Sequence, residues 1–157
     1  MTEISGQLTA VGRVGIVVSR YHKRVTARLL EGARRCCREA GIGEELVDVV
    51  WVPGAFELGS AAAALAQRGR YTALVALGAV VRGETPHFDY VAGEAARALG
   101  MLASVHTLPI GFGLLTVNSL QQAIDRAGGP AGDKGYEAAE AAIRTADAIR
   151  QVRGHGA

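Results

Sequence analysis

Three consecutive residues, Thr85, Pro86 and His87, combine the chemistry of an anion site with that of a proton carrier. Thr85 is a favoured capping residue and Pro86 suits the first helical position, so the sequence predicts that a helix begins here. The free amides and positive dipole end of such a helix attract anions. His87, in the first turn, could exchange protons near neutral pH beside a bound anion. An ordinary strand-to-helix turn with a structural histidine contains the same residue types, so both interpretations are open at this point.

Aromatic and acidic residues mark two other segments. Phe56 and Glu57 follow a Pro-Gly pair, and Tyr21 follows an apolar run. Beside a flat heterocyclic ligand, the two rings would supply apolar cover while neighbouring backbone groups met the polar edge of the heterocycle. The structural alternatives are core or rim positions for the rings and a dipole-complementing role for the Glu57 carboxylate.

Two cations and a phenylalanine lie in the last third of the chain. Arg126 ends one expected helix and Lys134 opens the next. A shared anionic partner would explain both cations, since arginine suits bidentate recognition of phosphate. As ordinary surface residues they would simply be solvated. Phe112 stands between Gly111 and Gly113, which indicates that it packs against another group, such as a second subunit.

Short apolar runs alternate with segments of helical periodicity along the chain. Residues 7–11 could add an N-terminal strand to the main set. The alternation predicts an α/β fold in which a mainly parallel four-stranded sheet carries helices on both faces. We expect the four strands at residues 14–18, 46–52, 73–81 and 103–108, and helices at residues 26–40, 57–67, 87–102, 118–127 and 133–150.

Ligands of such folds bind beyond the carboxyl ends of the strands. The unusual residues described above concentrate in the loops that should lie there, and this coincidence favours a small-molecule site. The loops are residues 19–26, 53–58, 80–88 and 111–118.

Composition excludes several classes of protein. The chain has 157 residues, the length of one domain, and 49% of them are hydrophobic, which argues against intrinsic disorder. A formal net charge of +2 gives no reason to expect a nucleic-acid or anionic-membrane partner. No apolar run approaches the roughly 20 residues of a membrane helix, and the first residues do not resemble a secretory signal. A soluble, cytoplasmic protein is therefore expected.

Motifs for metal or nucleotide chemistry are missing from the sequence. Cys36 and Cys37 are adjacent in an expected helix, where neighbouring side chains diverge, so two reduced thiols are expected. Neither these cysteines nor the four histidines have the spacing of metal ligands. Gly-x-Gly-x-x-Gly, Gly-Lys-Ser/Thr and Gly-x-Ser-x-Gly motifs are also absent.

Four segments together resemble the 6,7-dimethyl-8-ribityllumazine synthase family. They are PGAFE (residues 53–57), GAVVRGETPHFDYV (78–91), GFGLLT (111–116) and RAG (126–128). The resemblance runs in order from about residue 12 to 150, which makes residues 1–157 a single domain with residues 1–12 as an N-terminal arm. It implies a flavodoxin-like, three-layer αβα sandwich.

The resemblance also implies an activity, that of a transferase in the penultimate step of riboflavin biosynthesis. Members of the family condense 5-amino-6-ribitylaminouracil with 3,4-dihydroxy-2-butanone 4-phosphate, releasing phosphate and water, without a metal or organic cofactor. The alternatives are a non-catalytic flavin- or lumazine-binding paralogue and a paralogue that only forms a shell.

The roles of individual residues follow by position from this resemblance. Tyr21 matches an aromatic residue that stacks on the pyrimidine, and His87 matches the histidine that transfers protons. Arg126 matches an arginine that binds the phosphate from a neighbouring subunit, and Phe112 and Lys134 match residues that also come from that neighbour. The remaining positions match the ribityl site (Ala55, Phe56, Glu57), the pyrimidine edge (Ala79, Val80, Val81) and the phosphate turn (Glu84, Thr85).

The resemblance implies a pentamer as the basic assembly. The compact stretch at residues 128–133 is similar to that of members that build sixty-subunit icosahedral shells, for which riboflavin synthase is an expected cargo. The sequence departs from the family at two positions. Tyr21 stands where Phe or Trp is usual, and His22 stands where Asn is usual.

Overall fold

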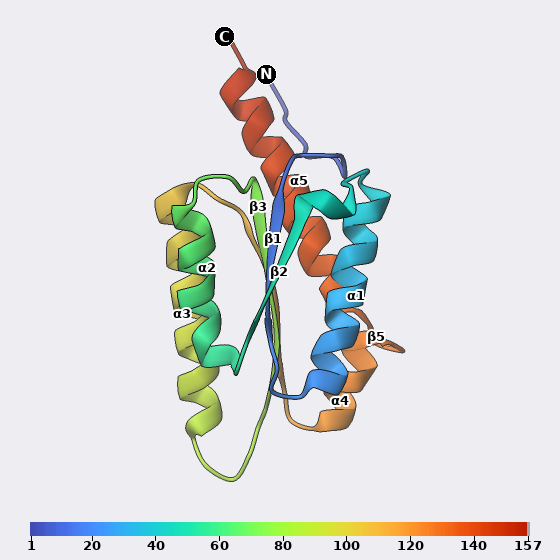
Figure 1. Ribbon diagram of the computed structural model, residues 1–157, viewed down its shortest axis with the longest axis vertical. Helices are drawn as coiled ribbons and strands as arrows, with labels where there is room; N and C mark the ends of the chain where they lie inside the picture. The colour runs from blue at the N-terminus through green and yellow to red at the C-terminus, as the bar shows by residue number, and fades with distance from the viewer. Residues whose placement is uncertain (157) are drawn as a thin grey trace.

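Four parallel strands form the central sheet of the computed structural model, which describes residues 1–156. They are β1 (Val14–Ser19), β2 (Val47–Val52), β3 (Ala73–Val81) and β4 (Ile110–Val117), in the order β2-β1-β3-β4. Helices α1 (Lys23–Glu39) and α5 (Lys134–Gly154) cover one face, and α2 (Leu58–Gln67) and α3 (His87–His106) cover the other (Figure 1). The predicted three-layer, flavodoxin-like α/β fold is therefore confirmed.

The burial of each strand follows from its position in the sheet. All six residues of β1 and the first seven of β3 are buried, as continuous apolar strands require when helices cover both faces. All six residues of β2 are half-buried, because this strand lies at an edge. The core is accordingly split into two clusters, one on each face of the sheet.

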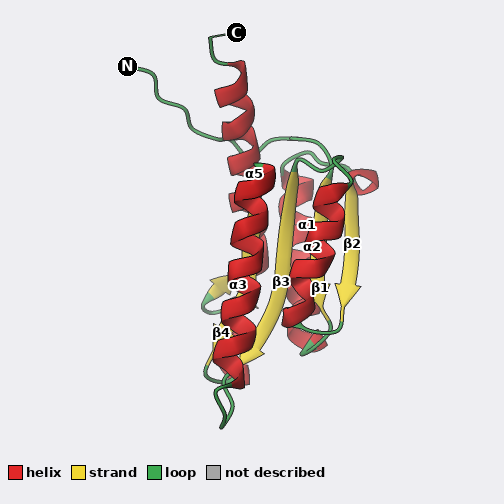
Figure 2. Ribbon diagram, turned by 90° about the vertical axis from the view of Figure 1, so that its left-hand side faces the viewer, coloured by secondary structure: helices red, strands yellow, loops and turns green. Residues whose placement is uncertain are grey.

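Shorter elements complete the connections. Two 3₁₀ turns, η1 (Glu44–Leu46) and η2 (Ala55–Glu57), flank β2. Helix α4 (Leu120–Arg126) follows β4 and leads into an antiparallel pair formed by β5 (Ala127–Gly129) and β6 (Gly132–Asp133). Figure 2 shows the long α3 packed along the sheet, with the chain termini at the end opposite the carboxyl ends of the strands.

The strand expected at residues 103–108 is wrong. Helix α3 continues to His106, and Thr107, with a φ of 48°, ends it in the left-handed conformation. The fourth strand, β4, begins only after Pro109. Its glycines have a packing reason, because a Cβ atom at Gly111 would overlap the main-chain oxygen of Ala138 on α5.

The N-terminal strand of the sheet is β1, and residues 7–11 add no further strand within residues 1–156. The arm that contains them binds α5 instead. The amide of Gln7 donates to Asp147 Oδ2 at 2.8 Å, and Gln151 Nε2 donates to the carbonyl of Ser5 at 3.0 Å. A Cβ atom at Gly6 would overlap the carbonyl oxygen of Arg144, so the arm lies directly against the helix.

Candidate active site

A pocket of about 690 Å³ lies at the carboxyl ends of the strands, between the end of β3, η2 and the start of α3. This is the edge at which the sequence predicted a ligand. Nine of the predicted site residues line the pocket: Tyr21, Ala55, Phe56, Glu57, Ala79, Val80, Val81, Thr85 and His87.

Tyr21 is held at the rim by the backbone. Its amide donates to the carbonyl of Pro53 at 3.0 Å, and the amide of Arg20 donates to Val52 at 2.7 Å, so the loop after β1 is tied to the loop after β2. The next residue, His22, adopts the left-handed conformation with a φ of 59° and turns the chain into α1. The Tyr21 side chain is 67% exposed, which leaves its ring free to cover a ligand.

Phe56 projects from the 3₁₀ turn η2 and is 59% exposed, so it is not a core residue. The turn is closed by a hydrogen bond of 3.3 Å from the amide of Glu57 to the carbonyl of Gly54. Ala55 is buried beneath it. Phe56 and Glu57 thus both line the pocket and bring an apolar ring and an acidic residue to it.

The wall that β3 contributes to the pocket follows directly after a glycine, Gly78. A Cβ atom at Gly78 would lie 2.9 Å from Leu114 Cδ1 and 3.0 Å from Ser19 Oγ, so a larger residue would push these neighbours aside. Residues 79–81, which follow it on β3, all line the pocket. The position of this wall is therefore set by close packing inside the sheet.

Helix α3 begins at His87, as the expected range of 87–102 has it, but its cap lies one residue later than predicted. Pro86 occupies the cap position and His87 is the first helical residue. The predicted capping role of Thr85 is wrong, because no side chain caps this helix. The first turn instead begins with a hydrogen bond of 3.0 Å from the amide of Asp89 to the carbonyl of Pro86. Thr85 consequently lines the pocket without capping the helix.

The structure adds lining residues that the sequence analysis did not single out. Tyr90 and Val91 lie three and four residues after His87, which places all three on one face of α3. Helical periodicity counted from His87 could have identified them. Tyr90 is 74% exposed, so the pocket has another aromatic side chain at its open side. Gly54, Gly83 and Phe88 complete the lining.

Four predicted site residues do not line this pocket. Glu84 lies on the turn between two lining residues but does not line the pocket itself. Phe112 and Lys134 line a separate hollow of about 590 Å³ between β4 and α5, where Lys134 pairs with Glu137 at 3.3 Å. Arg126 ends α4 and donates from Nη1 to the carbonyl of Gln122 at 3.0 Å. Within residues 1–156, no arginine or lysine of the same chain lines the pocket.

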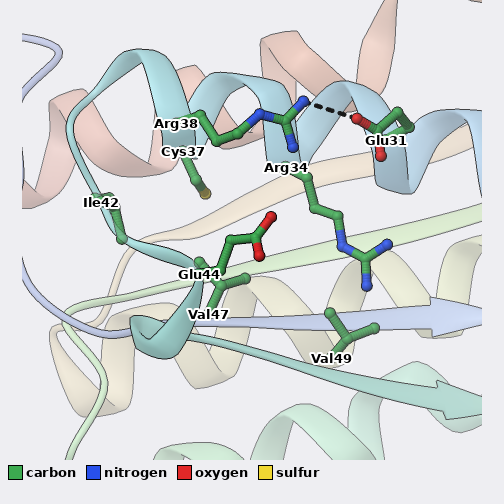
Figure 3. Close-up of a pocket in the computed structure, with 8 residues that line it drawn as sticks. All are labelled: Glu31, Arg34, Cys37, Arg38, Ile42, Glu44, Val47 and Val49. Carbon is green, nitrogen blue, oxygen red and sulfur yellow. Dashed lines mark hydrogen bonds and ion pairs between the residues drawn. The ribbon is translucent and has the colours of Figure 1, made fainter.

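A different hollow, of about 430 Å³, lies between α1, η1 and the first half of β2 (Figure 3). Its Arg38 is already paired with Glu31 at 2.8 Å. Burial raises the pKa of the Cys37 thiol at its wall to about 11, so this sulfur is a neutral thiol near pH 7. It lacks the aromatic walls and the histidine of the first pocket, which we therefore take as the candidate active site.

The fold and the pocket define an α/β protein that binds small molecules at the carboxyl edge of a parallel sheet. The comparison with known families gives the particular family. The chain matches the family model of 6,7-dimethyl-8-ribityllumazine synthase over residues 12–150, and it belongs to this family. Membership implies a transferase of riboflavin biosynthesis that acts on small-molecule substrates. None of the helices in residues 1–156 is long and apolar enough to span a membrane.

Proposed function

We propose that this protein condenses 5-amino-6-ribitylaminouracil with 3,4-dihydroxy-2-butanone 4-phosphate to give 6,7-dimethyl-8-ribityllumazine, releasing phosphate and water. The observation that carries the proposal is the pocket in which Tyr21, Phe56 and His87 meet. The family match over residues 12–150 supports it.

The pyrimidine substrate occupies the aromatic part of the pocket in this proposal. The Tyr21 ring stacks on the heterocycle, and the backbone of residues 79–81 meets its polar edge. Residues 55–57 hold the ribityl chain, whose hydroxyl groups suit the Glu57 carboxylate and the free backbone groups of a short turn.

The phosphate of the second substrate lies at the turn formed by Glu84 and Thr85. The uncapped start of α3 offers amide donors there, as an anion requires. A dianion also calls for a cation, and the pocket of a single chain has none among residues 1–156. We therefore assign Arg126 to this site from a neighbouring subunit, together with Phe112 and Lys134.

His87 transfers protons during the reaction. The amine of the pyrimidine attacks the ketone and one water leaves to form an imine. Phosphate then departs, and the ring closes with loss of a second water. An imidazole between the two substrates can accept and return these protons. Most of the rate enhancement comes from holding two substrates in the reactive orientation. No step in this scheme calls for a metal or an organic cofactor.

The assembly is part of the proposal. A site shared between chains calls for a ring of subunits, which we propose to be a pentamer in the cytoplasm. The tight turn between β5 and β6, with the amide of Ala131 bonded to Asp125 at 2.9 Å, is compatible with a sixty-subunit icosahedral shell enclosing riboflavin synthase. Sedimentation velocity of the purified protein distinguishes a pentamer from a shell.

A turnover assay tests the proposed reaction. Both substrates are mixed with the protein, and the fluorescence of the lumazine product is followed over time. We expect product formation that is proportional to enzyme concentration and saturates with each substrate. Binding of the pyrimidine or of riboflavin without any turnover would instead show a non-catalytic paralogue.

A further inference from the structure

We propose that Arg82 is a positioning residue, which fixes the Gly83–Pro86 turn so that Thr85 and His87 face the bound substrates. The inference rests on the proposed function, because it concerns the turn to which the phosphate is assigned. Nothing in the family match over residues 12–150 gives Arg82 this role.

The Arg82 side chain joins three segments of the chain. Its Nε donates to Asn118 Oδ1 at 3.2 Å, its Nη2 lies 3.6 Å from Asp89 Oδ1, and its Cζ lies 4.4 Å from the centre of the Phe88 ring. Its own amide donates to the carbonyl of Val117 at 2.8 Å. Arg82 thus connects the end of β3 with the end of β4 and with the first turn of α3.

The Gly83–Pro86 turn has few other contacts that hold it in place. Within residues 1–156, the backbone and side-chain groups of Gly83, Glu84 and Thr85 form none of the hydrogen bonds that occur outside the regular helices and strands. A Cβ atom at Gly83 would have no neighbour within 4 Å. The connection from β3 to α3 also projects beyond the other loops at this end of the molecule (Figure 1). The guanidinium closes the base of this turn by linking the residue before it to two residues after it.

The anchor on the far side is itself fixed. The amide of Asn118 donates to Gln122 Oε1 at 2.7 Å, and the amide of Gln122 donates to Ser119 Oγ at 3.2 Å. Asn118 is therefore held at the start of α4 while its side-chain oxygen accepts from Arg82. An acceptor held in this way can set the direction of the guanidinium.

The geometry calls for an arginine. A planar guanidinium can donate from Nε to one partner, pair through Nη2 with a second and stack its face on a ring at the same time. The compact ammonium of a lysine cannot make these three contacts together. Arg82 is half-exposed, as is Asp89, so these contacts contribute more to the placement of the turn than to overall stability.

Substitution of Arg82 by methionine and by lysine tests the proposal. We expect R82M and R82K alike to lower kcat/KM for the phosphorylated ketone by about ten- to a hundredfold, because small displacements of reacting groups have effects of this size. The KM for the pyrimidine should stay within about twofold, since no pyrimidine-binding residue depends on the turn. Arg97, another exposed arginine that pairs with an α3 carboxylate, provides the control R97M, which should behave as wild type.

The anchor gives a second test. N118A should reproduce most of the loss seen in R82M, and the double variant should lose little more than R82M, because both changes remove the hydrogen bond between Arg82 and Asn118 that sets the direction of the guanidinium. Full activity of R82K would show that positive charge alone suffices, and additive losses in the double variant would show independent roles. Either result overturns the proposal.

Hydrogen exchange separates this inference from the proposed reaction. Amides in peptides covering residues 82–90 should exchange faster in R82M than in the wild type, while the buried strands β1 and β3 keep their protection. This readout does not require turnover, so it tests Arg82 even if the wild-type protein yields no lumazine. Unchanged exchange at residues 82–90 in R82M would overturn the positioning role.

Discussion

His87 opens α3 and lines the pocket, so removal of its imidazole tests the proton-transfer role directly. We expect H87A to lower kcat by about 10²- to 10⁴-fold, the usual contribution of general acid–base catalysis, with assembly unchanged. Residual activity should be measurable because orientation of the two substrates persists. Steady-state fluorescence assays give kcat. A wild-type kcat in H87A would remove His87 from the mechanism.

Arg126 is assigned to substrate capture. R126A should raise the KM for the phosphorylated ketone by about ten- to a hundredfold, as expected when a charge-assisted hydrogen bond is lost. The KM for the pyrimidine should change little. Initial rates at varied ketone concentration measure the effect, and saturation at wild-type concentrations would exclude Arg126 from the site.

Site residues could be predicted from the sequence where they lie in a loop that follows a correctly predicted strand. Tyr21, Phe56 and His87 fall in this class, and each lines the pocket. Tyr90 was missed because an exposed aromatic residue within a helix carries no local signal until the neighbouring His87 is placed in a pocket. The capping role predicted for Thr85 failed by one residue, since helix termini depend on which carbonyl accepts the first bond.

Thr107 ends α3 in a conformation that disfavours a β-branched residue, with a φ of 48°. Glycine adopts this conformation freely, so T107G should raise the free energy of unfolding by about 1 kcal/mol. The matched control is S104G, inside the same helix, where glycine should lower stability by about 0.5–1 kcal/mol. Urea unfolding followed by circular dichroism measures both, and destabilisation by T107G would contradict this account of the helix end.

Asp147 ties the N-terminal arm to α5. Hydrogen bonds from the Gln7 amide and from Gln151, with the Arg150 guanidinium nearby, lower the pKa of its carboxyl group below the usual value. The carboxylate therefore stabilises the folded state above the pKa of the unfolded chain, about 3.9, and this contribution is lost as the pH falls through the lower folded-state pKa. D147N should show a weaker fall in stability between about pH 5 and pH 2. An unchanged pH profile would contradict the contact.

The sequence did not predict where α3 ends and β4 begins. Residues 103–106 are compatible with either a helix or a strand, and the choice follows from α3 continuing along the sheet. The glycines at 111 and 113 were read as a sign of weak support for Phe112. Both glycines also have a packing role, because a Cβ atom at Gly111 would overlap the main-chain oxygen of Ala138 on α5, and one at Gly113 would lie 2.5 Å from Leu77 Cδ2 on β3.

At the scale of the whole molecule, the apolar β1 and β3 made the parallel sheet and its covered faces predictable. The binding edge followed from the direction of the strands. The proposed sharing of the site between two chains could not follow from periodicity, because it depends on a surface that the sequence pattern does not define. In the structure, Phe112 and Lys134 line one hollow and His87 lines another, so a single chain does not bring these residues together.

Subunit mixing tests this shared site most directly. H87A and R126A proteins are dissociated, mixed in equal amounts and reassembled, and the rate is measured at a ketone concentration below the wild-type KM. About one quarter of the interfaces then combine an intact His87 with an intact Arg126, so we predict about one quarter of the wild-type rate. Mixing H87A with the double variant H87A/R126A provides the control, which should restore nothing. A rate equal to the average of the two separate variants would contradict a site shared between neighbouring subunits.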